Sequence, residues 1–359
     1  MINTPGYEDD SGELLRYIGD IFTPYQILYD RRKPGVVHLY GRLIAPPESA
    51  YDALKDRLSV FGYTPMLRED RGWHVLTLVP GVLVEPKPRS PLVNIVLAIL
   101  TFLTTTMIGK TFSTSSAPIW SLKDFTAGMP FSVSLMTILG IHELGHYFMG
   151  RKHKVSVTLP YFIPVPFGLG TFGAFIQMRS PVRNRRHLFD VGVAGPLAGA
   201  AVAIPLYVIG FSRSPIVPIS QGSTGLGSSL FVKFVDLFRH VPYGYDVMLN
   251  PVALAAWFGL FLTALNLLPI GQLDGGHVAY ALFGSVWGNR LAKATLVLLA
   301  VGSILWTGWM VWGFLALILG VTHPPLLDEI TTLDERRRWV GYLAIFLFLI
   351  TVPPKPFYF

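Results

Sequence analysis

FSVSLMTILGIHELGHYFMG, residues 131–150, is an apolar run that contains the pattern HELGH at residues 142–146. On a helix, His142 and His146 lie one turn apart and point in the same direction. Two imidazoles placed in this way can bind one zinc ion, and Glu143 beside them can act as a general base. The pattern therefore predicts a helix that carries a metal site and an adjacent proton acceptor.

The alternative is a chance match to a short pattern. In a chain of this size, the probability of such a match is on the order of a percent. Here the pattern lies inside a run that is long enough to cross a bilayer, where ionisable side chains are costly and rare. That position favours a functional metal site over a chance match.

The composition indicates a membrane protein with several spans. Of the 359 residues, 51% are hydrophobic and only 14% are charged, whereas about a quarter are charged in soluble proteins. The mean hydropathy is +0.48. The net charge of +7 is explained by Lys and Arg in loops, as the positive-inside rule requires, and not by binding to nucleic acid. Because the chain has no cysteine, a zinc site must use histidine and carboxylate ligands.

We expect an α-helical polytopic membrane protein with about seven transmembrane helices. The apolar runs cover residues 92–108, 131–150, 188–211, a run that begins near residue 251, 291–306, 308–321 and 340–352. Basic clusters lie at 87–89, 151–154, 179–186, 290–293 and 336–338. When the spans alternate in direction, all of these clusters fall on the cytoplasmic side. The N-terminus is then cytoplasmic, and the HELGH pattern lies near the cytoplasmic end of the second span.

Residues 1–85 are expected to form a small cytoplasmic α+β domain. Helices are predicted at 12–22 and 46–61, and strands at 36–44, 63–67 and 73–79. The proline-rich residues 86–91 are expected to be a linker. Residues 92–359 would then form a membrane-embedded domain, with its functional core at 130–285.

Residues 155–180 alternate short apolar stretches with prolines and glycines, so they are too broken for a helix and too apolar for a free loop. Open strand edges are not tolerated against lipid, so the segment should be shielded by protein or line a wet cavity. We interpret it as a re-entrant, β-hairpin-like element beside the metal site. Two roles are equally supported, namely edge-on pairing with an extended peptide and a structural plug.

Asp274 is the predicted third metal ligand. It lies in NLLPIGQLDGGH, residues 266–277, where a proline and three glycines break a span at membrane depth. The alternative is that Asp274 only caps the next helix. His277 is not predicted as a ligand, and Asp190 and His187 at the start of the third span are interpreted as interfacial residues. Small residues at 192–200 predict the close approach of another helix.

Together, these motifs resemble the paired signature of the site-2 protease family of intramembrane zinc metalloproteases. The two parts of the signature are HELGH at 142–146 and NLLPIGQLDGG at 266–276. GAFIQMRSP at 173–181 and GVAGPLAG at 192–199 are also similar to that family, so the likeness covers roughly residues 130–280. The N-terminal domain and the tripeptide HPP at 323–325 are similar to the cyanobacterial and plastid-type branch.

The resemblance implies one catalytic zinc ion held by His142, His146 and Asp274, with a fourth position open to water. It also implies that Glu143 acts as the general base and that the side-chain amide of Asn266 donates a hydrogen bond to the oxyanion of the reaction. A hydrogen bond between helices is the alternative role for Asn266.

The expected partners follow from a site buried in the bilayer. Such a site can cut only a segment that is already in the membrane, so the substrate class is a single-span transmembrane regulatory protein that is cut in regulated intramembrane proteolysis. The expected location is a bacterial inner membrane or a plastid-type membrane, no nucleic acid is expected, and the oligomeric state stays open. The alternatives are a polytopic metal transporter, whose ligands would be spread along a path, and a catalytically silent scaffold, against which the intact Glu143 argues.

Overall fold

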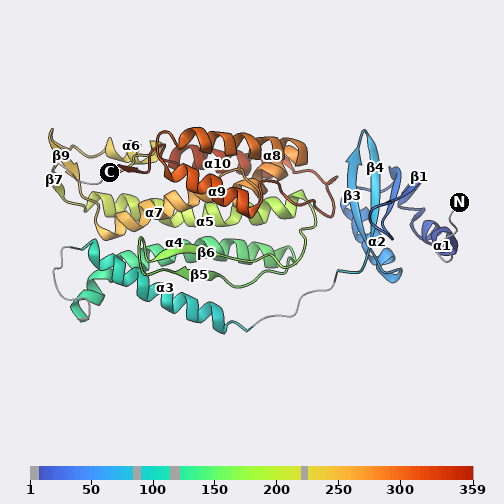
Figure 1. Ribbon diagram of the computed structural model, residues 1–359, viewed down its shortest axis with the longest axis horizontal. Helices are drawn as coiled ribbons and strands as arrows, with labels where there is room; N and C mark the ends of the chain where they lie inside the picture. The colour runs from blue at the N-terminus through green and yellow to red at the C-terminus, as the bar shows by residue number, and fades with distance from the viewer. Residues whose placement is uncertain (1–7, 84–89, 114–121, 220–224, 359) are drawn as a thin grey trace. The chain divides into compact units, whose positions relative to one another are not determined.

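The computed structural model describes residues 8–83, 90–113, 122–219 and 225–358. The chain divides into two compact units, whose helices and strands are labelled in Figure 1. The first unit contains the N-terminal residues up to Pro86 together with residues 180–188 and 324–334. The second contains Lys87–Arg179, Phe189–His323 and Glu335–Phe359. The predicted linker at 86–91 lies mostly outside the described residues.

The first unit is built on a four-stranded antiparallel sheet with the strand order β1-β2-β4-β3. Its strands are β1 (Phe22–Tyr29), β2 (Val37–Leu43), β3 (Tyr63–Asp70) and β4 (Trp73–Pro80), and its helices are α1 (Glu8–Ile18) and α2 (Pro47–Val60). Alternate strand residues and one face of α2 share a core, because the periods of strand and helix place apolar side chains on one side. Leu39, Leu54 and Leu76 are completely or almost completely buried there.

The helix predicted at 12–22 is wrong at its C-terminal end. Helix α1 ends at Ile18, and Phe22 already pairs with Leu43 of β2. Strand pairing with a distant partner overrides local helical spacing here. The other predicted elements of this region are found, and β3 and β4 are joined at Arg71 and Gly72. Both residues have positive φ, +50° and +83°, as a tight two-residue hairpin requires.

Two segments from later in the chain extend this sheet beyond β3. Leu67 donates its backbone N–H to the carbonyl of Leu327 at 2.8 Å, and its own carbonyl accepts from Glu329 at 2.8 Å. Asp328 in turn donates its backbone N–H to the carbonyl of Arg183 at 2.7 Å. Both additions are parallel. The N-terminal sheet therefore holds residues 327–329 beside β3 and residues 182–184 beside those.

Charged side chains support this extension. The Asp328 side chain is fully buried, and its carboxylate accepts hydrogen bonds from the backbone of Ile330 and Thr331. Arg183 and Arg186 form ion pairs with Asp52 and Glu48 of α2, at 2.9 and 2.7 Å. Residues 182–186 and 327–329 are thus held by the N-terminal sheet and α2 within the first unit.

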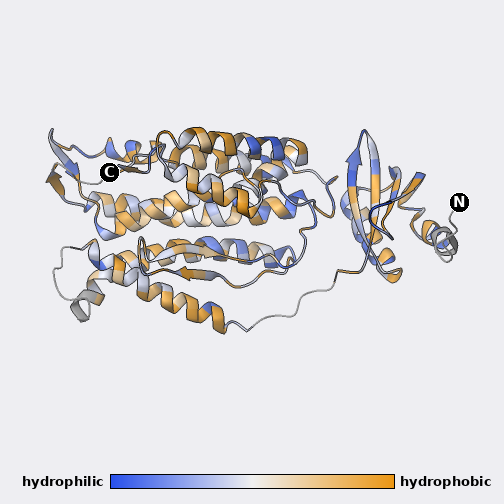
Figure 2. Ribbon diagram, in the orientation of Figure 1, coloured by the Kyte–Doolittle hydropathy of each residue, from blue (hydrophilic) through white to orange (hydrophobic). Residues whose placement is uncertain are grey.

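The second unit is mostly helical. Its helices are α3 (Leu92–Thr111), α4 (Leu122–Lys152), α5 (Arg185–Ser212, whose first turn belongs to the first unit), α6 (Leu230–Asp236), α7 (Pro251–Asn266), α8 (Asp274–Gly302), α9 (Gly308–Leu319) and α10 (Glu335–Thr351). Figure 2 shows hydrophobic residues along most of the length of the long helices, whereas hydrophobic and hydrophilic residues mix in the N-terminal sheet.

Within the described part of the chain, three helices are long and apolar enough to cross a membrane, namely α3, residues Phe125–Lys152 of α4, and α5. Helices α7 and α9 are apolar but shorter. Each of the seven predicted apolar runs overlaps a helix, but seven spans remain a prediction. Helix α8 begins at Asp274, well before the apolar run predicted at 291. Polar residues interrupt the first half of this helix, so that half does not stand out as an apolar run, and the helix is kinked at Gly284.

A two-stranded hairpin follows α4. Strands β5 (Tyr161–Pro164) and β6 (Thr171–Phe175) pair antiparallel, as predicted for this broken segment. Helix α3 holds both of its ends: the side-chain amide of Asn94 donates to the carbonyls of Leu159 and Pro160 at 2.9 and 3.0 Å, and the Thr104 hydroxyl donates to Gly170 at 2.7 Å. Its re-entrant position in a bilayer remains a prediction.

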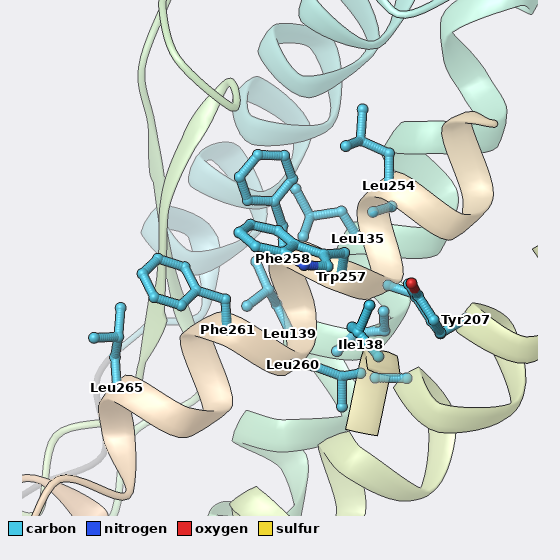
Figure 3. Close-up of a cluster of buried hydrophobic side chains, with 14 of the residues drawn as sticks. Leu135, Ile138, Leu139, Tyr207, Leu254, Trp257, Phe258, Leu260, Phe261 and Leu265 are labelled. Carbon is cyan, nitrogen blue, oxygen red and sulfur yellow. The ribbon is translucent and has the colours of Figure 1, made fainter. Parts of the chain in front are cut away.

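Two shorter strand pairs complete the unit. Strand β7 (Ile216–Pro218) pairs with β9 (Tyr245–Val247), and β8 (Gly225–Leu226) pairs with β10 (Phe357–Tyr358). The core of the unit lies where α4, α5 and α7 meet (Figure 3). Leu135 and Ile138 of α4, Tyr207 of α5, and Trp257 and Leu260 of α7 are nearly or fully buried there. This core positions the helices that carry the candidate site.

Candidate metal centre

Helix α4 carries His142, Glu143 and His146 in its C-terminal half. All three side chains are buried, with only 4–5% of each residue exposed. The imidazole centroids of His142 and His146 are 4.9 Å apart, as expected for residues one turn apart on one helix face. Two histidines and a glutamate packed among apolar helices require partners, because unpaired polar groups are costly there.

The third residue comes from the turn between α7 and α8. Asp274 is the first residue of α8, directly after a turn in which Gly271 has a φ of +51° and lies against the backbone of Gly320. One carboxylate oxygen of Asp274 lies 3.2 Å from Nε2 of His142, and the other lies 3.2 Å from Nε2 of His146. Among the described residues, these three form the one group of histidines and acids able to hold a metal, with ligand atoms within 4.8 Å of one another.

The contacts of His146 show that the group fits a divalent cation. Its Nδ1 donates to the carbonyl of Val191 at 2.7 Å, so Nε2 is left as an acceptor. This acceptor faces a carboxylate oxygen, and the two require a cation between them or a second proton on the ring. In a tetrahedral zinc site with bonds near 2 Å, neighbouring ligand atoms lie about 3.3 Å apart. The observed separations of 3.2 Å agree with that geometry.

Helix α5 packs against the histidines through glycine. A Cβ atom at Gly195 would lie 2.0 Å from Nε2 of His146, and one at Gly199 would lie 3.1 Å from Nδ1 of His142. On the other helix, a Cβ atom at Gly145 would lie 2.7 Å from the carbonyl oxygen of Ala194. The small residues at 192–200 thus bring the backbone of α5 to the imidazoles, which confirms their predicted role in close helix approach.

Glu143 lies beside the three converging residues and is not one of them. Its carboxylate lies near the backbone of Ile176, the residue after β6. Asn266 is the last residue of α7, and its Nδ2 lies 3.4 Å from Nε2 of His142. A carboxylate and an amide group therefore both lie next to the candidate ligands.

The other titratable residues considered in the sequence lie outside this group. Nδ1 of His277 is 2.8 Å from Nε2 of His323, so the two imidazoles pair with each other. Asp190 binds Arg337 and His153. The hydrogen bond from His146 to the Val191 carbonyl was not predicted from the sequence, because every residue has a backbone carbonyl and the residue type does not show which one is used. The nearby small residues indicated only that α5 approaches closely.

Two histidines and an aspartate around one point, with a buried glutamate beside them, define a candidate metal centre in a mostly helical protein with three candidate membrane spans among its described residues. Residues 130–307 match the sequence model of Peptidase family M50. The chain thus carries a Peptidase family M50 domain, which confirms the family resemblance inferred from its motifs.

Similar proteins include several from plants. "Probable zinc metalloprotease EGY2, chloroplastic" of Arabidopsis thaliana is 32% identical over 248 residues, which cover 66% of this chain and 43% of that protein. "Probable zinc metalloprotease EGY1, chloroplastic" of Oryza sativa subsp. japonica is 32% identical over 240 residues, which cover 64% and 41%. "Probable zinc metalloprotease EGY3, chloroplastic" of Oryza sativa subsp. indica is 28% identical over 295 residues, which cover 74% and 48%. The chain therefore spans less than half the length of these relatives. No solved structure gives a significant match.

Proposed function

We propose that this chain is an intramembrane zinc metalloprotease that hydrolyses a peptide bond within the transmembrane segment of a membrane-anchored protein. One observation carries the proposal: the side chains of His142, His146 and Asp274 converge among apolar helices, and Glu143 lies beside them without joining them. A transporter is expected to spread its ligands along a path, whereas these three converge at one point. The names and family of the similar proteins support the same conclusion.

The zinc ion would be held by Nε2 of both histidines and by the carboxylate of Asp274. When bound there, it supplies a Lewis acid that polarises water and the scissile carbonyl. The Val191 carbonyl keeps the proton of His146 on Nδ1 and so keeps Nε2 free to bind. His142, Glu143 and His146 are buried and the Asp274 side chain is 15% exposed, so electrostatic interactions within the group are stronger than in bulk water.

Glu143 would accept the proton of the attacking water and deliver it to the leaving amine. The amide of Asn266 would donate a hydrogen bond to the oxygen on which negative charge develops, a role that an amide donor can fill and a carboxylate cannot. The position of Asn266 beside His142 supports a place at the reacting atoms, and the same contact also joins α7 to α4.

The substrate would be a single transmembrane helix that unwinds before cleavage, because a helix hides its carbonyls in hydrogen bonds. Strand β6 leads to Ile176, whose backbone contacts Glu143. A peptide paired along β6 would therefore arrive at the base. The hydrogen bonds from α3 to the hairpin fit a structural plug equally well.

The same proposal includes the topology. Residues 1–85 form the cytoplasmic domain, 86–91 the linker and 92–359 the membrane domain, with seven spans, a re-entrant hairpin at 155–180 and the centre near the cytoplasmic side. The basic clusters at 151–154 and 336–338 support this orientation. The partners are the lipid bilayer and a regulatory protein with one span, in a bacterial inner membrane or a plastid-type membrane.

The test is co-expression of the chain with a panel of single-span regulatory proteins. We expect a shortened product of at least one regulator with the wild-type chain and none with Glu143→Ala at equal expression. Purified protein in liposomes distinguishes the alternatives, because movement of zinc across the bilayer without cleavage of any substrate would indicate a transporter.

A further inference from the structure

A partly buried ionic cluster connects α5 and α10 with the residue after α4, next to the candidate metal centre. The carboxylate of Asp190 on α5 binds Arg337 of α10 through two hydrogen bonds of 2.7 Å, from Nε and Nη2. The same carboxylate lies 2.8 Å from Nε2 of His153, which follows the last residue of α4. The Asp190 side chain is only 15% exposed and that of His153 only 12%. No step of the proposed reaction uses this cluster.

The cluster is one of two adjacent polar contacts between α4 and α5. Val191 follows Asp190, and its carbonyl accepts the hydrogen bond from Nδ1 of His146. Two neighbouring residues of α5 thus bind two points of the preceding segment. Val191 binds His146 within α4, and Asp190 binds His153 directly after α4 ends. Because a rotation or translation of α5 moves both residues together, the position of the Val191 carbonyl depends on the anchoring of Asp190.

Near the histidines, α4 and α5 approach each other through small residues, whereas their large side chains meet further along, in the core around Tyr207. The closest approaches involve Gly145, Ala194, Gly195 and Gly199. Small residues allow close approach but provide few side chains that interlock. Directional hydrogen bonds therefore contribute strongly to the register of the two helices. The bidentate contact of Arg337 adds a fixed geometry, since a guanidinium group binds a carboxylate in one plane.

We propose that Asp190, held by Arg337 and His153, is a positioning residue that aligns the Val191 carbonyl with His146 and so sets the metal-binding orientation of that imidazole. This inference rests on the proposed function, because it assumes that His146 is a zinc ligand. Outer partners of metal-bound histidines alter metal affinity by about 10- to 100-fold. The Val191 carbonyl is such a partner of His146, and Asp190 acts on it indirectly, through the backbone that the two neighbouring residues share.

The test measures zinc retention by the full-length chain in detergent. Asp190→Asn and Arg337→Gln are purified with zinc, and the release of the metal to an excess of a coloured chelator is followed over time. We expect release to be about 10-fold faster than from the wild type, at the lower end of the range for direct outer partners. Arg336→Gln and Arg338→Gln are matched controls, because both residues flank Arg337 in the sequence and both are exposed. They should release zinc at the wild-type rate.

A second readout separates positioning from a general loss of stability. Cobalt-substituted Asp190→Asn should show a changed visible absorption spectrum while its thermal unfolding stays cooperative, since the ligand geometry changes within a folded protein. If Asp190→Asn does not fold, Arg337→Gln and His153→Gln test the same cluster from its other members. An unchanged release rate together with an unchanged cobalt spectrum in the variants that fold would overturn the inference.

Failure of the proposed function would look different. A wild-type chain that binds no zinc, or that keeps its zinc in His146→Ala, would refute the metal centre itself. Stoichiometric zinc in the wild type, with Asp190→Asn behaving identically, would refute only the positioning role.

Discussion

Glu143 lies between two histidines in sequence, yet its side chain takes no part in the group that His142 and His146 form with Asp274. Helical spacing explains the difference: residues four apart share a face, and the residue directly after the first lies about 100° further round the helix. The carboxylate is buried and interacts with the backbone of Ile176. In the proposed function, different side chains of one helix turn would therefore bind the metal and transfer the proton.

Glu143→Ala should therefore retain zinc and lose cleavage. The loss in rate should be about 10²- to 10⁴-fold, the range for removal of a general base. Zinc is measured by mass spectrometry of the purified protein, and cleavage by the shortened product. His142→Ala serves as the control that loses both. Loss of zinc from Glu143→Ala would contradict its assignment as a base that is not a ligand.

Asp274→Ala should contain much less than one zinc per chain, because the remaining two histidines form an incomplete site. Asp274→Asn removes the charge but preserves the shape, so it distinguishes loss of a ligand from loss of a helix cap. If Asp274 only capped α8, both variants would keep a full complement of zinc in direct metal analysis.

At the scale of elements, the site depends on how closely α5 approaches α4. The approach is set by glycines, and at Gly195 the space for a methyl group is already occupied by the His146 ring. Asp190 and Val191, on the same helix, provide the polar contacts. The surface of α5 that faces the centre thus contributes backbone and small residues, while the ligand atoms come from α4 and α8.

Gly195→Ala should displace α5 or the His146 ring. The added Cβ would lie 2.0 Å from Nε2, far inside contact distance, so overpacking should cost about 1–3 kcal/mol of folding stability. We expect reduced zinc content and a lower unfolding temperature. Gly140→Ala on α4 is the matched control, since its Cβ would meet only Phe162 at 3.8 Å. Equal zinc content in the two variants would refute the packing argument.

At the scale of the whole molecule, the chain does not divide at a single point. The compact unit around the N-terminal sheet also contains residues 180–188 and 324–334, which come from two distant parts of the chain. Residues 327–329 lie along β3 as an added strand, and residues 182–184 lie beside them. Helix α5 begins at Arg185 and α10 at Glu335, directly after these segments. The N-terminal sheet thus holds residues 182–184 and 327–329, which come from two distant parts of the chain.

Asp328→Ala should loosen this added strand. The buried carboxylate satisfies two backbone N–H groups, and hydrogen bonds to a charged group are worth about 1.5–3 kcal/mol each. Hydrogen exchange should accelerate at the amides of Leu67 and Glu329, which pair the strand with β3. Asp70→Ala at the exposed end of β3 is the control. Unchanged exchange at both amides would show that the strand is held without Asp328.

The motif and its environment could be inferred from the sequence because they depend on local rules. Helical spacing aligns His142 with His146, hydropathy places them among apolar residues, and the proline and glycines before Asp274 predict a broken helix at a site. The strands and helices of the N-terminal sheet also follow from short-range patterns, apart from β1. That strand depends on pairing with β2, which no local pattern specifies.

Long-range contacts were decided only by the tertiary structure. The Val191 carbonyl that orients His146, the Asp190–Arg337 pair, and the addition of residues 182–184 and 327–329 to the N-terminal sheet all join distant parts of the chain. Every residue has a backbone carbonyl, so the sequence does not show which carbonyl accepts a given hydrogen bond. A charged residue likewise has many possible partners until the helices pack. The residue types of the candidate ligands could therefore be predicted from the sequence, whereas the contacts that orient these side chains form only when distant segments pack together.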